Sequence, residues 1–364
     1  LVMKLQSASA AARGAERALE SEQRQGRKVG VGLFPRHARM NHSCRPNASL
    51  YFSCVALKRP RVHARLLRDV EAGEEITITY VDLFATRAAR RDELRRRYHF
   101  ECSCERCEPA CGLPTPTGGE VRVACELSGL RDGTGGAAEE EEHVGRLERT
   151  IDELLHLELG EEDAPLEAGG AAAGVGRAID TALERVADAG TVLVPAHAVL
   201  VRARRSISRV CMGRRRFEDA AQQLRAEQRA LASVLPQHHP DLAAMAVTLA
   251  HCIARSASAE ALLLLLRPRF AYTSMAAIDE RLAPLSSPVL SLDDRLALLK
   301  SSAALYFQAC KTLAVCRGDE HILTVAAQKI ASRSLALLKV LRQRLRKIEA
   351  TWAAGTADQT AAAE

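Results

Sequence analysis

Apolar and polar positions divide the chain into a first part rich in short strands and a long helical remainder. Apolar residues alternate with polar ones, between turn residues, in segments that predict β-strands: Val29–Pro35 with a turn at its end, Ala48–Leu57, Arg61–Val70 and Glu75–Tyr80. The next segment predicts a helix with Thr86 as N-cap and with Leu94 and Tyr98 on one face. Residues 7–22 predict another helix, polar and rich in alanine.

Apolar residues recur at helical spacing from Val144 to about Ala354. Helix starts recur faintly at a period of 41 residues, which is typical of stacked helix pairs such as tetratricopeptide-like arrays. His239 and His321, 82 residues apart, are predicted to cap turns before helices. Two tracts are predicted to lie outside helices. Residues 131–143 are acidic and glycine-rich and predict a solvated loop, and residues 164–176 are predicted to interrupt the helices in the same way.

Composition supports a globular, helix-rich protein. Hydrophobic residues make up 47% of the 364 residues and aromatic residues only 4%, which favours helices over a β-sandwich. Charge is uneven: residues 1–111 hold 21 Lys and Arg against 13 Asp and Glu, whereas the remainder holds 30 against 32. The basic part could attract nucleic acid or an acidic partner, or form a basic rim around a site. No DNA- or RNA-binding motif accompanies it, so nucleic acid is disfavoured as a partner.

The cysteines indicate a metal site. There are 11, an odd number, and no secretory signal is visible, which disfavours a disulfide framework. The longest aliphatic run, Ala261–Leu266, is too short to span a bilayer, so no membrane association is expected. Cys102, Cys104 and Cys107 form a C-x-C-x-x-C cluster suited to zinc, and Cys44, Cys54 and Cys111 remain open as the fourth ligand. The other cysteines are predicted to be buried small apolar residues: Cys125, Cys211, Cys252, Cys310 and Cys316, with Cys54 if it is no ligand.

Three motifs carry a resemblance. "NHSCRPN" (Asn41–Asn47) is a polar turn that could hold a polar small molecule or satisfy its own backbone. Together with "GEEITITYVD" and "RRDELRRRYHFECSCERC", it resembles the C-terminal half of a SET domain and its cysteine-rich post-SET segment. The lead-in "VGVGLFP" and the helical C-terminal region make the chain similar to the SET- and MYND-domain (SMYD) family of protein lysine methyltransferases.

The resemblance implies a role for each motif residue. Asn41, His42 and Phe100 would contact S-adenosylmethionine, and Tyr80 and Tyr98 would be the active-site tyrosines, with Tyr98 lining the channel for the target lysine. The fourth zinc ligand would be Cys44, so that one zinc ion joins this loop to the cysteine-rich tail. The lysine amine must lose a proton, and its pKa is ordinarily about 10.4. A dry aromatic channel and a sulfonium charge both favour the neutral amine, whereas Tyr80, itself with a pKa near 10, is a poor general base.

The expected fold class is α+β: a small, β-rich C-terminal half of a SET domain with a zinc-bound post-SET segment, followed by an all-α, tetratricopeptide-like helical domain. The expected organisation is an N-terminal helical remnant (1–28), the SET half (29–82), the post-SET segment (83–111), a flexible acidic linker (112–146), the helical domain (147–354) and a disordered tail (355–364). Glu74 and Glu75, which follow Gly73, are predicted to lie in a solvated turn.

The predicted function is S-adenosylmethionine-dependent methylation of lysine side chains on histones or other proteins. The partners expected are a lysine-bearing protein substrate and, through the helical domain, a chaperone or chromatin protein; the expected location is the cytoplasm, the nucleus or both. The sequence starts at Leu1 and shows neither the glycine-rich cofactor strand nor the paired MYND cysteines, so we expect a truncated or divergent form. The alternatives are a catalytically incomplete, zinc-stapled scaffold that binds partners through its helices and, less favoured, a basic zinc module for nucleic acid.

Overall fold

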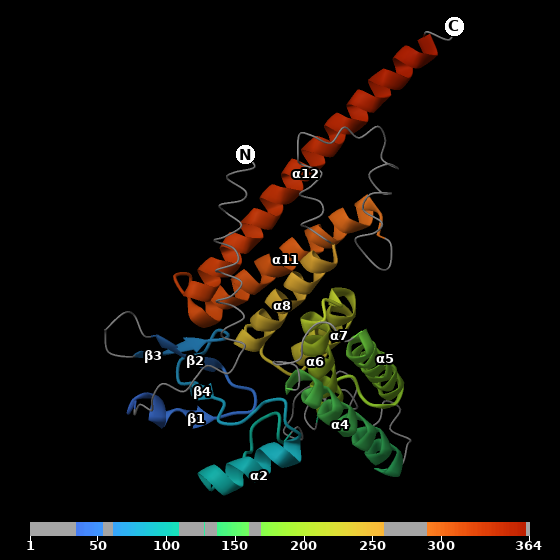
Figure 1. Ribbon diagram of the computed structural model, residues 1–364. Coiled ribbons are helices and arrows are strands. Elements are labelled where there is room, and N and C mark those ends of the chain that lie inside the picture. Colours follow the sequence, from blue (N-terminus) through green and yellow to red (C-terminus); the bar gives the residue numbers. More distant parts are fainter. Residues whose placement is uncertain are drawn as a thin grey trace. The chain divides into compact units, whose positions relative to one another are not determined.

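The computed structural model describes residues 34–53, 61–108, 127, 137–159, 169–257 and 290–361. Its elements are a short 3-10 helix η1 (His37–Arg39), strands β1 (Asn41–His42), β2 (Ala48–Ser53), β3 (Arg61–Leu66) and β4 (Thr77–Ile78), and helices α2 (Arg87–Tyr98), α4 (Ala137–Leu159), α5 (Gly169–Val192), α6 (Ala198–Gly213), α7 (Phe217–Ala232), α8 (Pro240–Ser256), α11 (Leu292–Arg317) and α12 (Ile322–Ala361) (Figure 1). Short strands therefore come first and helices follow, which confirms the predicted α+β class. The helix predicted for residues 7–22 and most of the strand predicted from Val29 lie outside the described residues.

The chain forms two compact units. The first unit comprises residues 27–245 and 312–321, and it contains the strands together with α2 and α4 to α7. The second comprises residues 1–26, 246–311 and 322–364. Its core lies where the end of α8 and the helices α11 and α12 bring aliphatic side chains together: Ala257, Leu292, Leu296, Leu299, Ala303, Leu338, Leu341 and Leu345. No helix in the described residues is both long and apolar enough to cross a membrane.

The strands form two small sheets. β2 and β3 are antiparallel, from the pair Ala48–Leu66 to the pair Ser53–Arg61. β1 and β4 are parallel, although far apart in the sequence, with Asn41 opposite Thr77. The strand predicted over residues 75–80 is thus reduced to two residues. Side chains instead of a neighbouring strand accept the hydrogen bonds of two of its backbone amides: the Thr77 amide donates to Asn47 Oδ1, and the Tyr80 amide donates to His42 Nδ1.

Helix α2 confirms the predicted N-cap. The Thr86 hydroxyl accepts a hydrogen bond from the Ala89 amide at 3.2 Å, which satisfies one of the free donors at the helix start. Leu94 is fully buried, whereas Tyr98, one turn later, is 42% exposed. His99 ends the helix in the left-handed conformation, with φ of 61°, and turns the chain toward the cysteine cluster.

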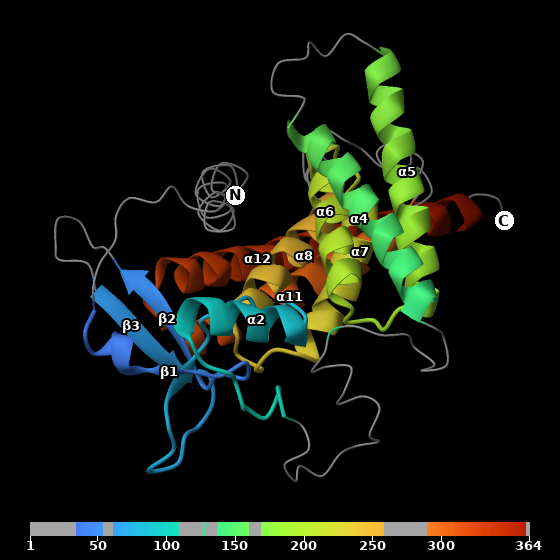
Figure 2. The ribbon, with the colours of Figure 1, turned by 90° about the horizontal axis from the view of Figure 1, so that it is seen from below.

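The helical layer of the first unit corrects two predicted boundaries. α6 packs against α4, α5 and α7, and both ribbon views show these four helices gathered together (Figures 1 and 2). α4 begins at Ala137, so residues 137–146 of the predicted acidic linker are helical. Its alanine and glutamate residues are good helix formers, and the first-turn Glu140 also pairs with His197. α5 likewise begins at Gly169, inside the tract predicted to interrupt the helices.

Two further predictions can be compared with the described residues. α12 extends to Ala361 and so enters the tail predicted to be disordered, where alanine-rich sequence favours helix. Among the scattered cysteines, Cys211, Cys252 and Cys316 are buried as predicted, Cys310 is only partly buried, and Cys54 and Cys125 lie outside the described residues. The 41-residue repeat stays a prediction.

Candidate active site and metal centre

Four cysteine sulfurs gather at one point of the first unit. The Sγ atoms of Cys44, Cys102, Cys104 and Cys107 all lie within 4.8 Å of one another. Cys44 lies 3.6 Å from Cys107 across 63 residues of sequence, and both side chains are fully buried. Of the three candidates for the fourth position, Cys44 is therefore with the cluster, and Cys54 and Cys111 lie outside the described residues.

Local backbone geometry explains why three sulfurs come from one short segment. The amides of Cys107 and Glu108 both donate to the Cys104 carbonyl, at 2.8 and 2.9 Å, which closes a tight turn. The buried guanidinium of Arg106 then ties this turn to the rest of the site, because it donates to the carbonyls of Cys44 and Leu83 at 3.3 and 2.8 Å. Arg106 thus connects the turn to the Asn-His-Ser-Cys loop.

The four sulfurs fit a tetrahedral zinc ion. With zinc–sulfur bonds of about 2.3 Å, neighbouring sulfurs of a tetrahedron lie about 3.8 Å apart, close to the observed spacing of Cys44 and Cys107. Hydrogen bonding within the cluster, above all to Cys102, lowers the pKa of Cys107 to about 6 and also lowers that of Cys104. The same hydrogen bonds raise the pKa values of Cys44 and Cys102, so a metal would have to displace their protons to bind all four sulfurs as thiolates.

His42 connects this centre to the aromatic residues. Its Nδ1 accepts the Tyr80 amide hydrogen at 3.0 Å, so in the neutral ring the proton lies on Nε2, 3.3 Å from Cys44 Sγ. Burial lowers the pKa of His42 and so favours this neutral ring. The imidazole ring centroid lies 5.4 Å from that of Tyr80 and 6.1 Å from that of Phe100.

The two tyrosines are neighbours. Their ring centroids are 4.8 Å apart, and the Tyr80 hydroxyl donates to the Met40 carbonyl. The pKa of Tyr80 is raised, first by burial and then by Tyr98 and Glu75 nearby. Tyr80 therefore stays a neutral phenol, which can donate and accept hydrogen bonds but does not readily give up its proton.

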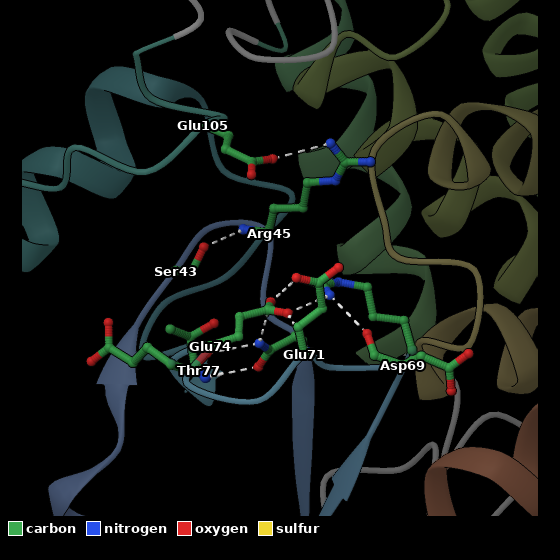
Figure 3. A network of polar contacts seen from close by, with 10 residues as sticks. Ser43, Arg45, Asp69, Glu71, Glu74, Thr77 and Glu105 are labelled. Carbon is green, nitrogen blue, oxygen red and sulfur yellow. Dashed lines mark hydrogen bonds and ion pairs between the residues drawn. The ribbon is translucent and has the colours of Figure 1, made fainter. Parts of the chain in front are cut away.

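Two asparagines connect the Asn-His-Ser-Cys loop to residues 74–77, which cross it. The exposed Asn41 donates from its amide nitrogen to Glu75 Oε1 at 2.6 Å. Asn47, only 3% exposed, donates to Glu74 Oε1 and to the Glu75 carbonyl at 3.1 and 2.8 Å, and it accepts from the Thr77 amide at 2.8 Å. Figure 3 shows Glu74 and Thr77 close together in this network of polar contacts. Glu74 and Glu75 thus take part in a network, which corrects the prediction of a merely solvated turn.

The structure therefore brings the four cysteines and the aromatic residues Tyr80, Tyr98 and Phe100 together around His42, whereas the exposed Asn41 side chain contacts Glu75. Sequence reasoning missed two others that organise the site, Asn47 and Arg90. The only signal for Asn47 was its place at the end of the quoted motif. Arg90 stands among many arginines and gave no signal of burial.

Comparison with known proteins agrees with this geometry. Residues 11–81 match the SET domain family, and the match begins before the boundary at residue 29 that the motifs indicated. Histone-lysine N-methyltransferase SMYD3 of Homo sapiens is 47% identical over 81 residues, 22% of this chain and 18% of that protein. Histone-lysine N-methyltransferase Smyd1 of Mus musculus is 38% identical over 96 residues, 24% and 20% of the two chains, and N-lysine methyltransferase SMYD2 of Homo sapiens is 37% identical over 79 residues, 22% and 17%. The matches thus span about a fifth of the length of these relatives. This chain thus carries a segment that matches the SET domain, and in that segment it is similar to lysine methyltransferases of the SMYD family.

Proposed function

We propose that this chain supplies part of an active site that transfers a methyl group from S-adenosylmethionine to a lysine side chain of a protein. The observation that carries the proposal is the double contact of His42. One ring nitrogen reaches Cys44 of the sulfur cluster and the other holds the backbone of Tyr80, so that a metal centre, a polar loop and an aromatic cluster share one framework. The names of the matched relatives support the same activity.

Asn41, His42 and Phe100 would hold the cofactor. The nitrogen of the Asn41 amide is engaged by Glu75, and no donor among the described residues reaches its oxygen, which leaves Oδ1 for an ammonium group of the ligand. The Glu75 carboxylate beside it suits a positively charged ligand. S-adenosylmethionine supplies an electrophilic methyl group on a positively charged sulfur.

Tyr80 and Tyr98 would receive the lysine amine. The raised pKa of Tyr80 keeps its phenol neutral, so we assign it the orientation of the amine rather than removal of the amine's proton. The two rings exclude water from one side of the approaching side chain and thereby disfavour the charged ammonium form. Alignment of amine and methyl group would account for much of the rate.

Cys44, Cys102, Cys104 and Cys107 would hold one structural zinc ion. A closed site of four sulfurs leaves no position for a substrate, so the ion's part is to fix the tail against the loop that carries Asn41 and His42. The protein substrate, a chaperone or chromatin partner of the helices, and a cytoplasmic or nuclear location belong to this proposal as predictions.

Transfer of a radiolabelled methyl group from S-adenosylmethionine to protein lysine tests the proposal. We expect labelling by the protein and a loss of at least tenfold when Tyr80→Phe and Asn41→Ala are combined. Arg97→Gln is the control, because Arg97 is exposed and pairs only with Glu93 among the described residues. Labelling that persists unchanged in the double variant would overturn the proposed roles.

A further inference from the structure

A fully buried arginine points at the sulfur centre. Arg90 lies in the first turn of α2 and has no exposed surface. Its Nε donates to Cys44 Sγ at 3.3 Å, and its Nη1 donates to the Ala85 carbonyl at 2.7 Å. Burying a guanidinium costs free energy unless anionic or polar groups compensate it, and the Cys44 sulfur and the Ala85 carbonyl are two acceptors that this guanidinium reaches.

The charge of a zinc-bound centre would need a positive group nearby, and Arg90 is in position to supply it. Four thiolates around a divalent zinc ion carry a net charge of about −2 in a site that is largely removed from water. Arg90 contacts the sulfur of Cys44, and the buried Arg106 contacts the carbonyl of the same residue. In a zinc-loaded site, two positive charges would therefore stand beside two excess negative charges. The N–H donors of Arg90 and His42 both reach the Cys44 sulfur, which lowers the charge that this sulfur must carry.

The position of Arg90 is fixed independently of the metal. The Arg90 amide donates to the Thr86 carbonyl at 2.9 Å, in the capped first turn of α2. A guanidinium can donate from Nε to sulfur while Nη1 holds the Ala85 carbonyl, because its donors form a rigid planar fork. A lysine ammonium would keep the charge but not this geometry.

We propose that Arg90 is the counter-ion of the metal centre and that its N–H···S hydrogen bond to Cys44 sets how tightly the centre retains zinc. The inference rests on the zinc site of the proposed function, and it assigns the helix α2 a part in metal binding. Its effect on methyl transfer would be indirect, through the Cys44–His42–Tyr80 connection, so Arg90 is a positioning residue.

Chelator competition on the purified full chain tests this inference. We expect Arg90→Gln to lose zinc at a chelator concentration roughly 10- to 100-fold lower than the unaltered chain does, because groups that support metal ligands typically change metal affinity by this factor. Arg90→Lys should fall between the two, and it serves as the test variant if Arg90→Gln does not fold. Arg97→Gln, in the exposed last turn of the same helix, should retain zinc normally.

Thermal unfolding with and without zinc separates this role from a merely structural one. A structural role would lower the melting temperature of the zinc-loaded and zinc-free forms equally, whereas a counter-ion should reduce the difference between them. Equal zinc retention in the Arg90 variants and the unaltered chain would overturn the inference while leaving the zinc site intact. An unaltered chain that binds no zinc would instead remove the metal site and this inference with it.

Discussion

Replacing Asn47 by Ala should loosen the crossing at which residues 74–77 pass the Asn-His-Ser-Cys loop. The Asn47 amide is buried and makes three hydrogen bonds there: to the Glu74 carboxylate, to the Glu75 carbonyl and from the Thr77 amide. Alanine can make none of them. The two backbone groups would then have no side-chain partner in a place that water reaches poorly.

The loss of stability in Asn47→Ala depends on which hydrogen-bond partners of Asn47 can bond to water instead. The Glu74 side chain is 29% exposed and keeps its ion pair with Arg68, so its carboxylate stays solvated and paired and its bond to Asn47 adds little. The bonds to Glu75 and Thr77 are each worth about 0.5–1.5 kcal/mol net, and together about 1–3 kcal/mol. Because about 1.4 kcal/mol corresponds to a factor of ten, the Thr77 amide should exchange its hydrogen roughly 10- to 100-fold faster in Asn47→Ala.

Amide hydrogen exchange, followed by mass spectrometry on peptides covering residues 74–80, measures this directly. Asn41→Ala is the matched control, since Asn41 is exposed and its amide bonds only the Glu75 side chain among the described residues. The control should leave exchange at Thr77 within about threefold of the unaltered chain, which is the effect of a bond worth well under 1 kcal/mol. Unchanged exchange in Asn47→Ala, or an equal increase in both variants, would refute the reasoning.

Three other predictions follow from contacts in the first unit. Asn41→Ala should weaken S-adenosylmethionine binding roughly tenfold in calorimetry, the loss expected for one hydrogen bond to a charged ligand group, without changing zinc content; unchanged affinity would exclude Asn41 from the cofactor site. The pKa of Glu74 is lowered to about 2, chiefly by the Arg68 guanidinium, so the stabilisation of the turn by the Glu74 carboxylate is complete above pH 4.5 and is lost as the pH falls through about 2. Amide exchange in the turn should therefore become faster over this pH range, and Arg68→Gln should move the change toward pH 4.5. An unmoved pH dependence in Arg68→Gln would show that Arg68 is not the cause of the lowered pKa. Gly318→Ala should destabilise the unit by about 1 kcal/mol or more, because φ is +96° and the new Cβ would meet the Arg65 guanidinium; a melting temperature equal to that of the unaltered chain would contradict this.

The sequence was informative where chemistry is local. The C-x-C-x-x-C spacing predicted a metal cluster and Thr86 predicted the start of α2, because a tight turn and a helix cap depend on a few neighbouring residues. The choice of Cys44 over Cys54 and Cys111 came only from the resemblance, since spacing does not tell which distant loop reaches the cluster. The structure places Cys44 with the tail, and the identity of the bound metal stays a prediction.

Contacts over long sequence distances could not be predicted. Arg90 is one of several arginines in "RAARRDELRRR", and its burial depends on how α2 is rotated relative to Cys44, 46 residues earlier. The first turns of α4 posed the reverse problem: a local pattern that fits two structures. Its alanine and glutamate residues suit either a solvated loop or the start of a helix, and Glu140 meets His197 only in the folded chain.

X-ray absorption spectroscopy at the zinc edge, with elemental analysis of protein purified without chelator, tests the claim on which the account depends. We predict one zinc ion per chain with four sulfur neighbours at about 2.3 Å, and three sulfurs with one lighter neighbour after Cys44→Ser. Folded protein without zinc, or a zinc ion whose surroundings do not change in Cys44→Ser, would contradict a centre that joins the Asn-His-Ser-Cys loop to the cysteine-rich tail.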